Sequence, residues 1–142
     1  MDIRHLGPEH TALLLAVEPG LFDHPADPAQ TRAFLESPLN EIVLAFDSGD
    51  AVAFASGTVL LHPDKPPAFF VNEVGTRESH RRRGFGTAVL RALIARARAR
   101  GSKGVWLGTE PDNAPALALY RRLGGDERGF VGFGWDGAFD GG

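Results

Sequence analysis

Apolar and polar positions follow two different periods along this chain, and the changes between them predict where strands give way to helices. Short apolar runs bounded by turn residues are typical of strands, and they predict strands at residues 2–6, 41–46, 51–61, 69–76 and 105–109. The turn residues Asp47–Asp50 favour an antiparallel hairpin between the second and third of these runs. A last, Gly-rich run with Phe130, Phe133 and Trp135 is also predicted to form a strand.

Helical spacing or helix start signals predict four helices, at residues 9–17, 31–36, 87–100 and 113–123. The second follows Asp27–Gln30, which places an acid at the N-cap and proline at the first helical position. Asn113 is expected to cap the last helix, and Gly101 and Gly124 are expected to end the third and fourth. The strand, helix, strand unit at residues 69–109 should be a right-handed crossover with parallel strands. We therefore predict an α/β fold: a mixed, mostly antiparallel sheet with a central parallel strand pair and helices on both faces.

The composition fits a single domain over residues 1–142, because 43% apolar content can supply one sizeable core. The chain has no cysteine, which excludes disulfides, thiolate metal sites and cysteine nucleophiles. No apolar run reaches the roughly 18 residues of a membrane span, and the first residues lack the apolar stretch of a signal peptide. We expect a cytoplasmic protein that does not bind membranes. The five histidines lack the spacing of metal ligands, so no metal is expected: His5, His10, His24, His62 and His80.

Charge is distributed unevenly along the chain. The net charge is −3, but residues 77–103 hold nine of the fifteen Lys and Arg residues and one of the eighteen Asp and Glu residues. This asymmetry favours one surface for an anionic partner and a largely acidic surface elsewhere that attracts cations. The arginines lack interleaved aromatic residues and the whole chain is acidic, which argues against a nucleic-acid partner.

The segment Arg81–Thr87, RRRGFGT, lies between a predicted strand and a predicted helix. Its glycines let the backbone approach an anion closely, and the first amides of the helix lie at the positive end of the helix dipole. Arginines add bidentate bonds to phosphate, so the segment predicts a pyrophosphate ligand. The alternative is a glycine-containing helix start with solvated arginines. The segment lacks the Gly-Lys-Ser/Thr ending of a Walker loop and the third glycine of Gly-x-Gly-x-x-Gly, which disfavours nucleotide hydrolysis and nicotinamide chemistry.

Two motifs resemble the signatures of the GNAT superfamily of N-acetyltransferases. Arg81-x-x-Gly84-x-Gly86 is similar to the family's cofactor signature, Gln/Arg-x-x-Gly-x-Gly/Ala, and residues 73–76 occupy the place of its cofactor-contacting strand. Residues 112–124 resemble the second hallmark, an Asn-capped helix with a Leu-Tyr pair that ends in Leu-Gly. The resemblance covers residues 41–136. In the first 40 residues, only the order of strands and helices resembles the family.

The resemblance implies acetyl-coenzyme A (acetyl-CoA) as a cosubstrate and a place for it on the chain. Main-chain groups of Val74 and Thr76 would pair with the pantetheine arm like an added strand, and Asn113 would reach the same arm. The signature segment would hold the pyrophosphate through Arg81, Arg82, Arg83, Gly84, Gly86 and Thr87. The chain departs from the family at Gly75 and Thr76, where larger apolar residues are usual. Gly75 is interpreted as a β-bulge position that opens the sheet for the thioester.

Acetylation of an amine needs a base, because the amine is protonated at pH 7. Glu73 is the candidate base, directly or through a water molecule, with a backbone amide near Val74 for the oxyanion. The alternative for Glu73 is a strand carboxylate paired with an arginine. Glu110 and Asp112, after the predicted parallel strand, are the rival bases.

Tyr120 is the candidate general acid, since a tyrosine at the matching place in the family protonates the leaving thiolate. Helical spacing puts Asn113, Leu117 and Tyr120 on one helix face, so Tyr120 can share the cofactor side of Asn113. The alternative is an amphipathic core tyrosine with its hydroxyl at the rim.

The acceptor is expected to be a small cationic amine that attacks directly in a ternary complex. The short chain, the loop His62–Pro67 and the segment Thr109–Gly124 most resemble the small aminoglycoside 3-N-acetyltransferases, and an acidic surface suits a polycationic sugar. The alternatives are a polyamine, a peptide or protein N-terminal amine, and a non-catalytic acyl-CoA sensor. Phe130, Phe133 and Trp135 either wall the acceptor pocket or, the favoured interpretation, pack in the core. The oligomeric state stays open, a homodimer included.

Overall fold

The computed structural model describes residues 1–140. The chain divides into two compact units, of which the first is Met1–Gly108 and the second begins at Thr109. The single domain over residues 1–142 stays a prediction. None of the helices in the described part of the chain is long and apolar enough to cross a membrane.

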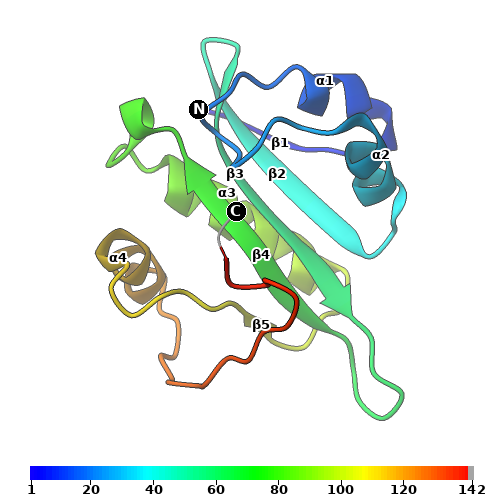
Figure 1. Ribbon diagram of the computed structural model, residues 1–142, viewed down its shortest axis with the longest axis vertical. Coiled ribbons are helices and arrows are strands. Elements are labelled where there is room, and N and C mark those ends of the chain that lie inside the picture. The colour runs from blue at the N-terminus through cyan, green and yellow to red at the C-terminus, as the bar shows by residue number, and fades with distance from the viewer. Residues whose placement is uncertain (141–142) are drawn as a thin grey trace. The chain divides into compact units, whose positions relative to one another are not determined.

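Five strands of the first unit form one mixed sheet (Figure 1). In sheet order they are β1 (Asp2–His5), β2 (Asn40–Asp47), β3 (Asp50–Leu60), β4 (Ala68–Thr76) and β5 (Val105–Trp106). Neighbours are antiparallel except β4 and β5, which are parallel as the strand, helix, strand order predicts. The predicted α/β fold is confirmed, but the parallel pair lies at one edge of this sheet instead of at its centre, and β5 ends earlier than the predicted Thr109.

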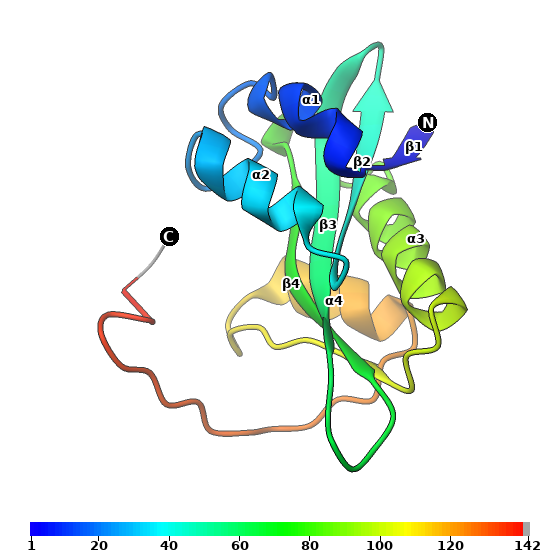
Figure 2. The ribbon, with the colours of Figure 1, turned by 90° about the vertical axis from the view of Figure 1, so that its right-hand side faces the viewer.

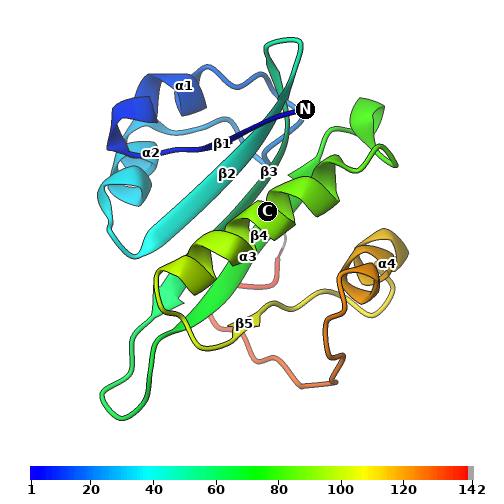
Figure 3. The same ribbon diagram turned by 180° about the vertical axis from the view of Figure 1, so that it is seen from behind.

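Helices cover both faces of this sheet, as predicted. The helices α1 (Thr11–Leu15) and α2 (Pro28–Glu36) lie on one face, and α3 (Phe85–Ala99) lies on the other (Figure 2, Figure 3). Asp27 caps α2 as expected, since its carboxylate accepts from the Gln30 amide at 2.8 Å. The predicted helix 9–17 is not continuous: a 3₁₀ turn (Pro8–His10) precedes α1.

Alternate residues of β2 supply the two sides of the core. Ile42, Leu44 and Phe46 pack in one cluster with apolar side chains of α1, α2 and the loop between them. The residues between these three face the other way, toward α3. There the buried side chains of α3 follow the predicted helical spacing: Val89, Leu90, Leu93 and Ala97. Full burial of a Leu or Val side chain contributes about 1.5–3 kcal/mol, so the two layers hold the sheet firmly between the helices.

One buried acid fastens α3 to the sheet. Glu41 of β2 is 3% exposed, and its carboxylate accepts from Arg96 Nε at 2.9 Å and from Arg100 Nη1 at 2.7 Å. His5 Nε2 lies 2.5 Å from the same carboxylate. Burial raises the pKa of Glu41, but the two arginine hydrogen bonds and the His5 charge outweigh it and leave the pKa below its ordinary value. The C-terminal half of α3 is therefore tied to β1 and β2 by charge.

The second unit contains α4 (Ala114–Arg122), which has the predicted N-cap. The Asn113 side chain accepts from the Ala116 amide at 3.2 Å, and Pro115 occupies the first turn. After the helix, Arg121 donates to both carboxylate oxygens of Glu127 at 2.6 and 3.0 Å. Both side chains of this pair are exposed, so solvent screens the ion pair and it adds little to stability.

The predicted final strand is wrong, because residues 125–135 form neither helix nor strand. Phe130, Phe133 and Trp135 are 68%, 77% and 75% exposed, so their favoured interpretation as core residues is also wrong. The glycines between them explain the difference. Glycine loses the most conformational entropy in a strand and offers no side chain to pack, so this run needs a partner strand to become regular.

Candidate functional site

The free edge of β4 is the first feature of the candidate site. Strand β5 pairs with β4 at only two positions, Phe69 with Val105 and Phe70 with Trp106. Strand β4 continues to Thr76, and within residues 1–108 the part from residue 71 onward has a strand partner only on the β3 side. Such an edge presents main-chain donors and acceptors with which an extended ligand can pair.

Alternation along β4 decides which main-chain groups point toward this edge. The Arg77 amide donates to the Val52 carbonyl of β3 at 2.8 Å. In an antiparallel pair, every second residue directs its N–H and C=O to the partner strand. The main-chain groups of Arg77 and Gly75 are therefore directed toward β3. Val74 precedes Gly75, and Thr76 lies between Gly75 and Arg77, with no shift of register. Their N–H and C=O groups are therefore directed toward the free edge.

The predicted bulge at Gly75 is wrong. The register of β4 against β3 shifts between Ser56 and Gly57, which leaves Asn72 as the extra residue of β4. Gly75 pairs regularly with Phe54, and a Cβ at Gly75 would lie 2.7 Å from Cε1 of the Phe54 ring. Glycine is needed at this position because the aromatic ring packs directly against the backbone.

The segment Arg81–Thr87 connects the end of β4 to the start of α3. It follows a 3₁₀ turn (Glu78–His80), and Gly84 is the N-cap of α3 with a left-handed φ of 84°. Arg82 also has a positive φ, 63°, which is uncommon for residues with a Cβ and recurs at ligand-binding loops. The first intrahelical bond runs from the Ala88 amide to the Gly84 carbonyl at 3.1 Å, so the preceding amides point out of the N-terminal end of α3.

Two of the three arginines in this segment carry uncompensated charge. Arg81 and Arg82 are exposed, and among residues 1–140 neither guanidinium has a hydrogen bond or an ion pair. Their charges add to the positive end of the α3 dipole. The arrangement is suited to an anion such as a pyrophosphate, which the sequence predicts here.

Asp47, at the end of β2, holds this segment in place. His80 Nε2 lies 2.9 Å from the Asp47 carboxylate, and Arg83 Nη2 lies 3.6 Å from it. The His80 side chain is 20% exposed and its ring also packs edge-on against Phe85. The sequence pattern does not reveal this contact, because Asp47 and His80 are 33 residues apart.

Glu73 lies on the face of β4 that carries α1 and α2. It alternates with Gly75 and Arg77, and the Gly75 position meets Phe54 of the cluster beneath these helices. Burial raises the pKa of Glu73, the charge of Asp23 raises it further, and His24 opposes them. A carboxylate with a raised pKa is suited to accept a proton near neutral pH. Among residues 1–140, no arginine is paired with Glu73.

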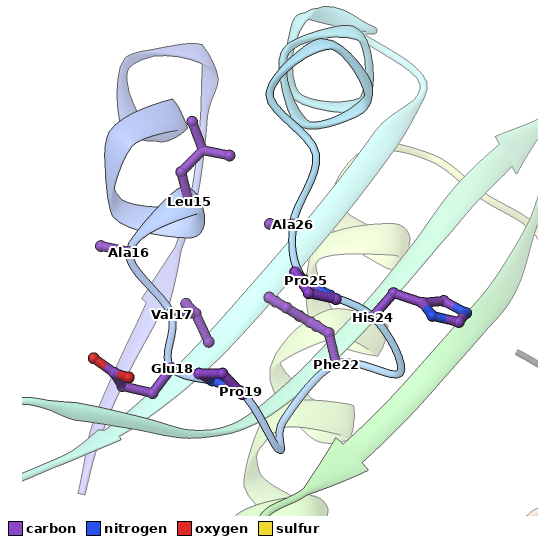
Figure 4. Close-up of a pocket in the computed structure, with 9 residues that line it drawn as sticks. All are labelled: Leu15, Ala16, Val17, Glu18, Pro19, Phe22, His24, Pro25 and Ala26. Carbon is purple, nitrogen blue, oxygen red and sulfur yellow. The ribbon is translucent and has the colours of Figure 1, made fainter.

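A pocket opens on the same face, in the loop that joins α1 to α2. It measures about 310 Å³ and is lined by nine residues between Leu15 and Ala26 (Figure 4). Glu18 and His24 lie at opposite sides of it, with Phe22 between them. The volume falls at the small end of ligand pockets, which span about 300–1,000 Å³. His24 lines this pocket, and its positively charged form lowers the pKa of Glu73.

Asn113 and Tyr120 belong to the second unit. Asn113 Oδ1 is used by the helix cap, which leaves the Asn113 Nδ2 group as a donor. Burial raises the pKa of Tyr120 above its ordinary value of 10, so its phenol stays protonated at neutral pH. The rival bases Glu110 and Asp112 are exposed. The first unit thus brings together Glu73, the Val74–Thr76 edge and the Arg81–Thr87 segment, and the second unit presents a capping amide and a protonated phenol.

Comparison with known proteins identifies the family. The model of the acetyltransferase (GNAT) family matches residues 9–125, so the chain belongs to this family, as its two motifs indicate. Over 102 residues the chain is 36% identical to N-alpha-acetyltransferase RimI of Mycobacterium tuberculosis. This match covers 72% of the chain and 62% of RimI, so the chain spans less than two thirds of that curated relative.

Solved structures share the fold. An aminoglycoside acetyltransferase, HMB0005, from an uncultured soil metagenomic sample superposes with a TM-score of 0.81 at 26% identity, over 95% of this chain and 97% of that one. The enzyme AAC(6')-Iy, in complex with the bisubstrate analog CoA-S-monomethyl-acetylneamine, gives a TM-score of 0.79 at 21% identity over the same shares. At that identity the second likeness shows the fold alone.

Proposed function

We propose that this chain transfers the acetyl group of acetyl-CoA to an amine by direct attack in a ternary complex. The observation that carries the proposal is the free edge of β4, which leads into a glycine- and arginine-rich helix start. A ligand that joins an amide-containing arm to a pyrophosphate fits both parts, and coenzyme A is such a ligand. Membership of an acetyltransferase family supports acetyl-CoA as the cosubstrate.

The proposed cofactor site uses the backbone more than the side chains. Val74 and Thr76 pair with the pantetheine arm through main-chain groups, and Asn113 donates to it from α4. The pyrophosphate lies at the start of α3, against the residues of the family signature: Arg81, Arg82, Arg83, Gly84, Gly86 and Thr87. Glycines leave room for close approach of the backbone, and the exposed arginines neutralise the phosphate charge.

Glu73 and Tyr120 divide the proton transfers between them. Glu73, directly or through a water molecule, takes a proton from the ammonium group of the acceptor, and the freed nitrogen lone pair then bonds to the thioester carbonyl carbon. The Val74 amide is directed toward the free edge and stabilises negative charge on the carbonyl oxygen. Tyr120 gives its proton to sulfur as the carbon–sulfur bond breaks, and the extra proton on the attacking nitrogen returns to the phenolate, directly or through water. The products are an N-acetyl amide and free CoA thiol.

The proposed acceptor is a small cationic amine such as an aminoglycoside, acetylated at a 3-amino group. Glu73, Asp23 and Glu18 place acidic groups on the α1 and α2 face, and opposite charge favours a cation there. The structural likeness to an aminoglycoside acetyltransferase supports this class. A second candidate is the N-terminal amine of a peptide or protein, which the relation to N-alpha-acetyltransferase RimI favours.

Free thiol release from acetyl-CoA, followed over a panel of amines, tests the proposed function. We expect thiol release from acetyl-CoA to be faster with aminoglycosides that have a free 3-amino group than with peptides that begin with alanine. We also expect CoA to raise the melting temperature of the protein more than ATP or NAD does. Ligand at roughly 100 times its dissociation constant adds about 2.7 kcal/mol to stability. Stabilisation by CoA without thiol release from any amine would identify a sensor, and no shift with saturating CoA would exclude the cofactor site.

Gly84→Asp is expected to bind CoA about tenfold more weakly than Gly84→Asn. Both side chains have the same size and both tolerate a left-handed φ, so only the aspartate charge beside the pyrophosphate separates them. Calorimetry gives the two dissociation constants. Arg91→Ala, on the exposed side of α3, is the control and should bind like the parent. Equal constants for the aspartate and asparagine variants would contradict the pyrophosphate role of this segment.

A further inference from the structure

Arg77 joins the end of β4 to two distant parts of the first unit. Its Nε donates to the Ala51 carbonyl at 2.7 Å, its Nη1 to the Pro19 carbonyl at 2.8 Å and its Nη2 to the Glu18 carbonyl at 2.8 Å. The planar guanidinium is the side chain that can donate in three fixed directions at once, and a lysine ammonium offers no such fork. Arg77 therefore clamps the beginning of the loop between α1 and α2.

The rest of this loop follows the clamp across the sheet. The Leu21 carbonyl lies 3.5 Å from the position that a Cβ of Gly75 would take, and the Phe22 ring packs edge-on against Phe54 with centroids 4.7 Å apart. Residues 18–22 are thus held on β3 and β4 by one arginine and one aromatic contact. Asp23 and His24 come next, on the face of β4 that also carries Glu73.

We propose that Arg77 is a positioning residue for the acceptor: it holds residues 18–24 on the sheet so that Asp23 and His24 lie beside Glu73. Asp23 then supplies a second carboxylate that attracts a cationic acceptor. This role rests on the proposed function, in which Glu73 is the base. Among residues 1–140, the three hydrogen bonds of the Arg77 side chain all go to main-chain carbonyls, so it acts through the loop.

The clamp has an electrostatic consequence that can be measured. Burial and Asp23 both raise the pKa of Glu73, whereas His24 lowers it, and these are the charged groups that act on Glu73. Burial and Asp23 dominate, so release of the loop should lower the pKa of Glu73. The pH at which the rate rises with ionisation of Glu73 should then move down.

Arg77→Gln and Arg77→Lys test the clamp, with Arg91→Gln as the matched control on the exposed side of α3. We expect KM for the amine to rise about tenfold in both Arg77 variants, because misplaced groups lose productive contacts, while the dissociation constant of CoA stays within twofold. The acid limb of the kcat/KM profile should move to lower pH. An unchanged KM for the amine together with an unchanged acid limb would overturn the proposal.

A second measurement separates the clamp from the proposed reaction. Carboxyl carbon NMR follows the titration of Glu73, whose signal is the one that Glu73→Gln removes, and needs no turnover. Asp23→Asn, with Arg77 intact, should lower the pKa of Glu73 in the same direction as Arg77→Lys. If neither variant changes the Glu73 titration, the clamp is overturned even where the enzyme is active. If Asp23→Asn and Arg77→Lys both lower the pKa of Glu73 but the protein acetylates no amine, the clamp stands and only the proposed function fails.

Discussion

Glu73→Gln is expected to lower kcat/KM for the amine by about 10² to 10⁴ near neutral pH, the usual contribution of a positioned base. Glutamine keeps the size of the side chain and cannot accept the proton. In the parent, the rate should rise as pH increases through the pKa of Glu73, because only the ionised carboxylate is a base. Burial and Asp23 raise that pKa, so the rise should come at a higher pH than for an ordinary glutamate.

The pH profile of the variant distinguishes a base from a binding group. Without Glu73, the amine has to lose its proton to water, so the variant's rate should keep rising toward the amine's own pKa, roughly 10, and the deficit should shrink. Glu36→Gln, an exposed acid of α2, is the control and should behave like the parent. A constant deficit at all pH values would make Glu73 a binding group. Loss of activity in Glu110→Gln or Asp112→Asn, but not in Glu73→Gln, would transfer the role to the rival bases.

Tyr120→Phe is expected to lower kcat about 10²-fold, at the low end for proton transfer, because a thiol of pKa about 8.5 is already a fair leaving group. Phenylalanine keeps the ring and removes only the proton donor. The loss should appear in kcat with KM for the amine unchanged, as for an interaction made only in the transition state. The dissociation constant of CoA and the melting temperature should not change.

Tyr120 is the chain's only tyrosine, so its ionisation can be followed directly by ultraviolet absorbance. Burial raises the pKa of Tyr120 above 10, and we expect a single titration with its midpoint above that value. The phenol then stays protonated from pH 6 to 9, and the Phe variant's deficit should persist across this range. A variant that melts like the parent and acetylates its best amine at an undiminished rate would show that Tyr120 is a packed residue and that solvent is the acid.

Apart from the final strand, the order of elements and several of their ends were determined by the sequence alone, because the interactions behind them are local. Asp27 and Asn113 each cap a helix by accepting from an amide three residues later, and this geometry needs no partner from elsewhere. The helical spacing of α3 likewise appears in the sequence as clearly as in the core. The segment Arg81–Thr87 was recognisable because its glycines and arginines are consecutive.

Tertiary structure alone decided the contacts between residues that are far apart in the chain. Arg77 reaches the Glu18 carbonyl across 59 positions, and Arg100 reaches Glu41 across the same separation, so no local pattern marks either pair. Gly75 was misread as a bulge because the reason for a glycine there is the Phe54 ring on the neighbouring strand. The aromatic residues of the Gly-rich run around Phe133 favour a strand, but a strand forms only when another one pairs with it, and composition does not specify that partner.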